Sequence, residues 1–149
     1  MKIDAVMGVI SFPGITIGPH MLRHEFLQTS LGATARVGVV NQGWVTLHVD
    51  LEPGVHGSLI FKDDQLVQVI ATMDLASGEK EEWSESSEIK RKSQHDAWLK
   101  LELGNPPYRY LWGSVGSEFD SKSCSSDIVI TFGTFPEQKD WRNKKEQSA

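Results

Sequence analysis

The first residues that could carry chemistry are two histidines, His20 and His24, which stand four positions apart. On a helix this spacing places both imidazoles on one face, where they could serve as two ligands of a metal ion. The neighbouring sequence offers no third ligand, and the H-E-x-x-H pattern does not occur. We therefore interpret both as surface histidines, and we expect neither a metal nor a cofactor.

The single cysteine, Cys124, is the other obvious candidate for reactivity. A cysteine nucleophile needs a nearby histidine or a helix N-terminus to lower its pKa, and His48, His56 and His95 are the histidines that the fold could bring near it. One cysteine can form neither an intramolecular disulfide nor a multi-cysteine zinc site. We favour a loop residue with an unused thiol.

Acidic side chains gather around the start of a predicted helix, at Glu79, Glu81, Glu82, Glu85 and Glu88. In the first turn of a helix they suit the helix dipole, and as a surface they could steer a basic protein partner. Trp83 stands among them, and an exposed tryptophan surrounded by acids resembles an interface hot spot. We expect the partner-binding residues to be these: Trp83, Glu81, Glu82, Glu85 and Glu88, with the loop acids Asp63 and Asp64.

His95 and Asp96 are adjacent polar residues inside the same helix. Asp96 falls on the side of Leu99, so its burial would require a partner such as Lys92, Arg109 or backbone N–H groups. A structural hydrogen bond is our first interpretation, and a catalytic aspartate is the second.

Composition and motifs exclude several classes of protein. The chain has 149 residues and a formal net charge of −5, which suits one soluble domain and argues against a nucleic-acid binder. Phosphate-binding glycine loops and the G-x-S-x-G nucleophile pattern do not occur. The short apolar run at residues 5–12 resembles neither a secretory signal nor a membrane span, so we expect a cytoplasmic protein.

Alternating apolar residues predict the strands. In residues 44–51, Val45, Leu47, Val49 and Leu51 alternate with polar neighbours, which indicates a strand with one buried face. Residues 35–40, 58–61 and 66–73 extend this into an antiparallel meander, with turns at 41–43 and 62–65. Two further short strands are expected at 5–10 and 14–17, and a short helix within 19–32.

The C-terminal half reads as one long helix and a hairpin. Ser84 can cap the helix, and Gly104 followed by Pro106 and Pro107 stops it. The last strands are expected at residues 110–119 and 127–133. The fold class is therefore α+β: an antiparallel sheet of about six strands, a meander and then a C-terminal hairpin, with one long and one short helix packed mainly on one face. We expect a single domain over residues 1–135 and a polar, flexible tail over 136–149.

Three pieces of sequence occur in an order that resembles a known class of proteins. They are His24-Glu25-Phe26-Leu27, the helix from Trp83 to Gly104, and Trp112-Gly113 leading to Ser125-Ser126-x-Ile128-x-Ile130. Together they resemble bacterial immunity proteins, which are encoded beside secreted polymorphic toxins. The resemblance implies a non-catalytic protein that binds one cognate toxin domain and covers its active site.

A second function remains open from the residues alone. A small-molecule-binding or enzymatic domain would hold a pocket between sheet and helix, with a polar lining of His48, Asp50, His95, Asp96 and Arg109. An enclosed cavity that holds several of these side chains would favour this alternative. A filled core with an acidic outer surface would favour inhibition of a protein.

Overall fold

The computed structural model describes residues 1–74 and 84–133. The predicted partner residues Glu81, Glu82 and Trp83, and the predicted tail at 136–149, lie outside the described residues. Among the described residues, no helix is long and apolar enough to cross a membrane.

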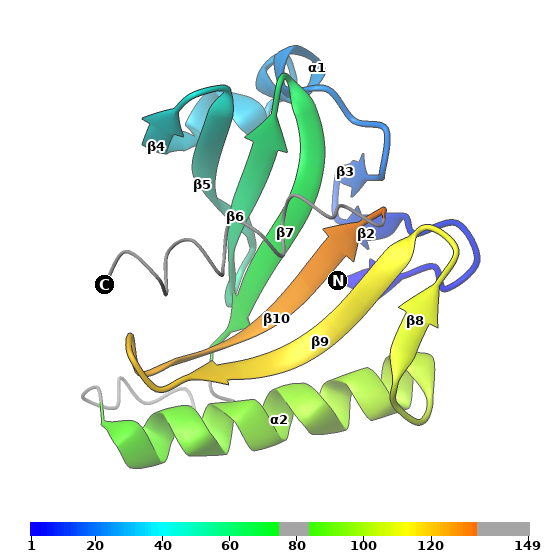
Figure 1. Cartoon of the computed structure of the whole chain (residues 1–149), viewed down its shortest axis with the longest axis vertical. Helices are drawn as coiled ribbons and strands as arrows, with labels where there is room; N and C mark the ends of the chain where they lie inside the picture. Colours follow the sequence, from blue (N-terminus) through cyan, green and yellow to red (C-terminus); the bar gives the residue numbers. More distant parts are fainter. Residues whose placement is uncertain (75–83, 134–149) are drawn as a thin grey trace.

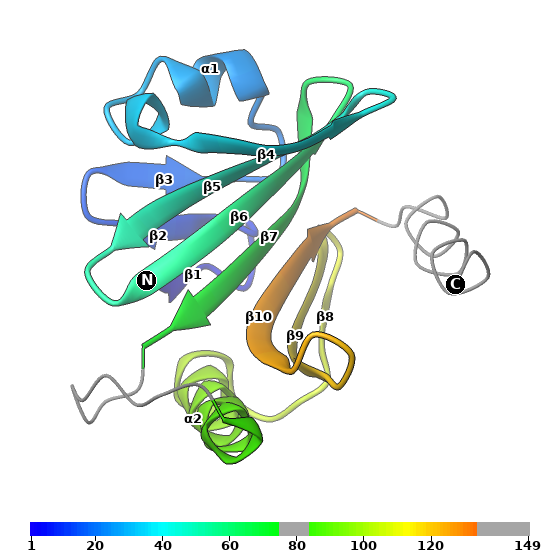
Figure 2. The same cartoon turned by 90° about the vertical axis from the view of Figure 1, so that its left-hand side faces the viewer.

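Seven strands form one antiparallel sheet in the order β4-β5-β6-β7-β10-β9-β8 (Figures 1 and 2). Their bounds are β4 Arg36–Asn41, β5 Trp44–Glu52, β6 Val55–Lys62, β7 Gln65–Met73, β8 Tyr108–Tyr110, β9 Gly113–Asp120 and β10 Ser125–Phe132. The meander β4–β7 and the C-terminal hairpin are thus joined through the pairing of β7 with β10.

A smaller sheet precedes the large one and packs against its inner face (Figure 2). It has the order β1-β2-β3, with β1 Lys2–Ile3, β2 Ile10–Phe12 and β3 Ile15–Ile17. The short helix α1 Arg23–Leu27 and the 3-10 turn η1 Gly32–Thr34 follow it. Phe26 is the buried residue of α1, and its ring lies 6.3 Å from that of Phe61.

Turn chemistry fixes the register of the meander. Asp63 and Asp64 both adopt positive φ, as a two-residue turn between twisted antiparallel strands requires, and aspartate tolerates this conformation better than most residues. The turn Gln42-Gly43 has the same property between β4 and β5. Both turns were predicted at these positions, and both are confirmed.

The long helix α2 spans Glu85–Leu103. Ser84 caps it as predicted, accepting a hydrogen bond from the Ser87 N–H while the Ser87 hydroxyl accepts one from the Ser84 N–H. Gly104 ends it with a positive φ, which glycine adopts without a steric cost. The local sequence therefore determines both helix ends.

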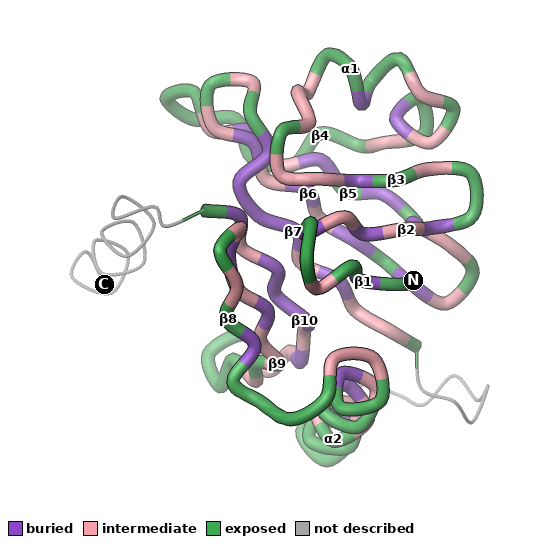
Figure 3. Tube along the Cα trace, turned by 90° about the vertical axis from the view of Figure 1, so that its right-hand side faces the viewer, coloured by how far each residue is buried: buried purple, intermediate pink, exposed green. Residues whose placement is uncertain are grey.

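One face of the large sheet carries the core (Figure 3). Period-2 alternation sends the same side of every strand inward, so the buried residues repeat every second position. The fully or almost fully buried side chains of this face include Leu47, Leu59, Phe61, Val69, Ile128, Ile130 and Phe132. The small sheet, α1 and α2 all cover this inner face, which leaves the opposite face of the sheet without a second layer among the described residues.

Polar contacts, as well as Leu99, dock α2 on the sheet. Glu88 is 4% exposed, and its carboxylate accepts hydrogen bonds from the Ser126 backbone N–H at 3.0 Å and from Arg91 at 2.6 Å. The Ser126 hydroxyl donates in turn to the Glu88 carbonyl at 2.5 Å. One turn before Leu99, the buried His95 accepts a hydrogen bond at Nε2 from the Met73 backbone N–H at 3.2 Å.

The α+β class and the single-sided packing agree with the sequence-based expectation, while the strand count differs. About six strands were expected, but the large sheet has seven and a second sheet has three. The predicted strand at 110–119 is divided by a turn into β8 and β9, and residues 5–7 form a turn where a strand was expected. The three strands before α1 have two or three residues each, too few to show alternation.

Removing the Glu88 carboxylate should loosen the attachment of α2. Glu88→Ala leaves the Ser126 N–H and the Arg91 guanidinium without their buried acceptor, so we expect the free energy of unfolding to fall by about 3 kcal/mol in denaturant titration. Glu85→Ala is the matched control, because it removes an exposed acid from the same helix and should cost less than about 1 kcal/mol. Equal effects of the two substitutions would contradict this account of the docking.

Candidate functional site

The outer face of the large sheet, opposite to α2 and the small sheet, presents polar side chains. It carries the residues that alternate with the core set, including His48 and Asp50 of β5, His56 and Ser58 of β6, Thr72 of β7 and Asp127 of β10. The strands therefore place titratable and hydroxyl side chains in a row across neighbouring strands.

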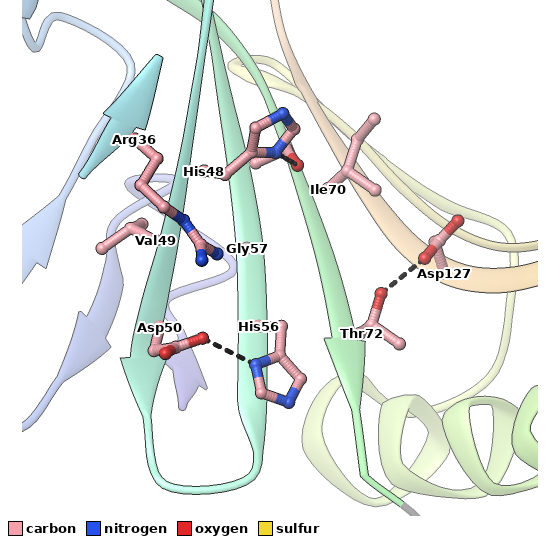
Figure 4. Close-up of a pocket in the computed structure, with 10 residues that line it drawn as sticks. Arg36, His48, Val49, Asp50, His56, Gly57, Ile70, Thr72 and Asp127 are labelled. Atoms are coloured by element: carbon pink, nitrogen blue, oxygen red, sulfur yellow. Dashed lines mark hydrogen bonds and ion pairs between the residues drawn. The ribbon is translucent and has the colours of Figure 1, made fainter. Parts of the chain in front are cut away.

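A hollow of about 350 Å³ lies on this face and is open to solvent (Figure 4). Side chains from five strands, β4, β5, β6, β7 and β10, contribute to it. The lining consists of Arg36, His48, Val49, Asp50, His56, Gly57, Ser58, Ile70, Thr72 and Asp127. Several of its polar groups are paired with one another: His48 Nδ1 lies 2.8 Å from Ser58 Oγ, and the Thr72 hydroxyl donates to Asp127 at 2.6 Å.

His56 connects two carboxylates at the lower end of this face. Its Nδ1 lies 2.7 Å from Asp50 Oδ1, and its Nε2 lies 3.1 Å from Asp74 Oδ1. A neutral imidazole carries one N–H, so both contacts are hydrogen bonds donated by histidine only when the ring is protonated. The hydrogen bond to Asp50 raises the pKa of His56 above its ordinary value, and Asp74 adds to this effect. The same hydrogen bond lowers the pKa of Asp50.

The predicted partner acids fall into two groups at opposite ends of the molecule. Asp63 and Asp64 form the β6–β7 turn beside α1, whereas Glu85 lies at the start of α2 beyond the other end of β7 (Figures 1 and 2). Asp64 is already paired with His24 at 2.5 Å and with Arg23 at 3.6 Å. The described acids therefore do not form one continuous patch.

Glu88 is the predicted partner acid that the structure places in the interior. Both of its carboxylate oxygens are engaged by Arg91 and Ser126. Its carboxylate and its backbone carbonyl both contact Ser126, which places it on the helix side that faces β10. Glu88 therefore serves the docking of α2 and is not available at the surface.

The five residues of the alternative pocket are also separated. His48 and Asp50 lie on the outer face, and His95 is buried under α2 on the inner face. Asp96 is exposed on α2 and pairs with Lys92 at 2.9 Å, and Arg109 is exposed on the edge strand β8. Asp96 therefore makes a structural hydrogen bond to Lys92, one of the partners named for it, and Ser117 of β9 also helps to lower its pKa. The sequence analysis did not foresee that its neighbour His95 contacts the sheet, at the Met73 N–H of β7.

The sequence analysis missed Asp74 and Asp127 and did not connect His56 with Asp50. Asp50 and His56 flank the β5–β6 turn, and the Asp50–His56 pairing follows directly from that hairpin register. Pro53-Gly54 marks this turn in the sequence, and a search for oppositely charged residues equidistant from it would have found the pair. Asp127 required the β7–β10 pairing, which joins strands far apart in the sequence.

Cys124 and His24, two of the candidates for reactive chemistry, make contacts with nearby groups. Cys124 lies in the β9–β10 turn with a positive φ, and its thiol contacts the Ser121 carbonyl at 3.5 Å. His24 is bound to Asp64, as described above. Within residues 1–74 and 84–133, histidine, cysteine and acidic side chains form no group of three or more that could hold a metal ion.

Comparison with known proteins finds a solved structure with a similar fold. No family model and no curated protein matches this chain. The chain is similar to a chain of the solved structure of Rhs1-CT in complex with its cognate immunity protein RhsI1, with a TM-score of 0.57 and 16% sequence identity. The similarity covers 99% of this chain and 97% of that chain.

The protein therefore has the α+β fold of a component of a Rhs toxin–immunity complex. At this sequence identity, the likeness establishes the fold alone.

The two histidines that differ most in environment should give pH effects of opposite sign. Burial holds the pKa of His95 below its ordinary value of 6.5, against the pull of Asp127. Just below pH 6.5, His95 is protonated in the unfolded chain but not in the folded chain. The free energy of unfolding should therefore fall as the pH drops below about 6.5, by up to about 1.4 kcal/mol per pH unit. Comparing chemical denaturation of the wild type and His95→Gln between pH 5 and pH 8 measures this, and an unchanged pH slope in the variant would contradict it.

The raised pKa of His56 works in the other direction. Its paired form is fully present below 6.5, the ordinary value, and is lost as the pH rises through the higher folded-state pKa. An NMR titration should place the His56 midpoint above 6.5, and Asp50→Asn should lower that midpoint because it removes the main cause of the shift. A midpoint that does not respond to Asp50→Asn would show that the pairing is absent in solution.

Proposed function

We propose that this protein is an immunity-type inhibitor, which binds a cognate bacterial toxin domain and covers its active site without catalysing a reaction. The observation that carries the proposal is the likeness, over nearly the full length of both chains, to a component of the Rhs1-CT and RhsI1 complex. The resemblance seen in the sequence motifs points to the same class independently of the fold.

The distribution of side chains supports a protein ligand over a small one. The polar residues proposed for an enclosed pocket lie on different faces of the sheet, and the hollow that exists is open to solvent. Protein-binding surfaces need no enclosed cavity, since a shallow polar rim around an anchoring side chain is sufficient.

The proposed toxin-facing surface is the acidic end of the large sheet near the start of β10, where the outer face adjoins the N-terminus of α2. It combines Asp50, Asp74 and Asp127 with Glu85, because the start of α2 is held beside the start of β10 through Glu88 and Ser126. The segment between Asp74 and Ser84 contains three of the predicted partner-binding residues, Glu81, Glu82 and Trp83. This surface would steer a basic catalytic cleft toward the inhibitor, with Trp83 as the anchoring side chain.

The direct test is co-expression with the product of the neighbouring upstream gene. That product should be toxic alone and should be neutralised when it forms a stable complex with this protein. A harmless neighbour that forms no complex would contradict the proposed function.

Binding measurements on the complex would then locate the surface. Trp83→Ala should weaken toxin binding by more than about 2 kcal/mol, about 30-fold in Kd, without unfolding the protein. Asp74→Asn should slow association at low salt, whereas Asp63→Asn is the matched control at the other end of β7 and should leave the association rate unchanged. A stronger effect of Asp63→Asn would move the surface to the β6–β7 turn.

A further inference from the structure

The strand β4 forms an uncovered edge of the large sheet. It pairs with β5 on one side, and all six of its residues are exposed. Within the described residues no other segment pairs with it, so it presents outward-pointing backbone N–H and C=O groups. The opposite edge, β8, has only three residues and follows two prolines, which makes it a poor template for pairing.

This edge is apolar where edge strands of monomeric proteins are usually protected. Val37, Val39 and Val40 are 64%, 63% and 66% exposed. Residues 36–41 contain neither lysine nor proline, and Arg36 is the one charged side chain in RVGVVN. Charged residues, proline and β-bulges are the usual means of preventing edge-to-edge association; β4 has one bulge and one charged residue, but neither lysine nor proline.

The bulge in β4 gives the strand an internal symmetry. Val37 lies opposite Leu47 and Val40 lies opposite Val45, so two residues, Gly38 and Val39, occupy the space of one on β5. Consequently Val37 and Val40 share the inner face of the sheet with their buried partners. Arg36 and Asn41, opposite His48 and Trp44, share the outer face.

We propose that β4 pairs with β4 of a second copy of this chain in an antiparallel dimer centred between Gly38 and Val39. This register places Val37 opposite Val40, Arg36 opposite Asn41, and each bulge opposite the other. Both faces are preserved, valines meet valines on the inner face, and no two like charges lie directly opposite. A two-fold interface requires a strand that is complementary to itself, as β4 is in this register. Pairing with a strand of a different protein would not require this.

The proposal is independent of toxin inhibition, since the proposed toxin-facing surface lies around Asp74 and α2 rather than on β4. Pairing would join two seven-stranded sheets into one continuous sheet. Two copies could then each present an acidic surface to a toxin domain.

Sedimentation of the full chain from about 1 μM to about 1 mM tests the association. We expect a concentration-dependent dimer, and Val39→Lys should raise its dissociation constant at least tenfold because it places two added charges side by side at the centre of the interface. Val6→Lys is the matched control, since Val6 is 82% exposed in the β1–β2 loop and should leave the dimer unchanged. A protein that stays monomeric throughout, or a dimer insensitive to Val39→Lys, would overturn the proposal.

Disulfide trapping tests the register. In a Cys124→Ser background, a mixture of Val37→Cys and Val40→Cys chains should form a cross-linked heterodimer on oxidation, because directly opposite Cβ atoms lie close enough for a disulfide. Each variant alone should remain uncross-linked, since its two cysteines would be about 10 Å apart along the strands. Cross-linking within a single variant would overturn this register, and loss of toxin capture in a monomeric Val39→Lys protein would show that the edge serves the toxin instead.

Discussion

The attachment of α2 to one face of the sheet is the constraint on which the rest of the structure depends. The helix has little apolar surface to bury, since Leu99 is its one fully buried large apolar side chain. Its position is set instead by the buried Glu88 carboxylate on β10 and by the His95 imidazole on β7. Hydrogen bonds are directional, so they fix the rotation and the register of the helix more narrowly than an apolar stripe would.

This attachment makes the two faces of the sheet differ in burial and polarity. The small sheet, α1 and α2 are all used to cover the inner face, so the outer face keeps its polar side chains at the surface. A sheet with one covered and one open face is a common arrangement for antiparallel strands, because their two faces can differ in polarity at every second residue. The open face brings titratable groups of neighbouring strands within hydrogen-bonding distance, as it does for His56 between Asp50 and Asp74.

Local sequence was sufficient for much of the fold. Alternation in residues 44–51, the turns at Gln42-Gly43 and Asp63-Asp64, and the caps Ser84 and Gly104 all correspond to short-range physical preferences, and each occurs where it was expected. The pairing of β7 with β10 depends on contacts across about 60 residues, and no local pattern encodes it. The sequence analysis also took Glu88 for a surface acid, because residue type alone does not distinguish a buried glutamate or histidine from an exposed one. The site is less predictable than the fold because it depends on the long-range pairing of β7 with β10, which alone brings Asp127 to it.

The central proposal is that the acidic end of the open sheet face meets a toxin domain. Hydrogen–deuterium exchange of this protein, measured alone and with the product of the neighbouring upstream gene, tests this most directly. The account predicts slower exchange on binding in the β5–β6 turn between Asp50 and His56 and in the first turn of α2, with no change in the β6–β7 turn. Protection confined to the β6–β7 turn, or to the edge strand β8, would contradict it.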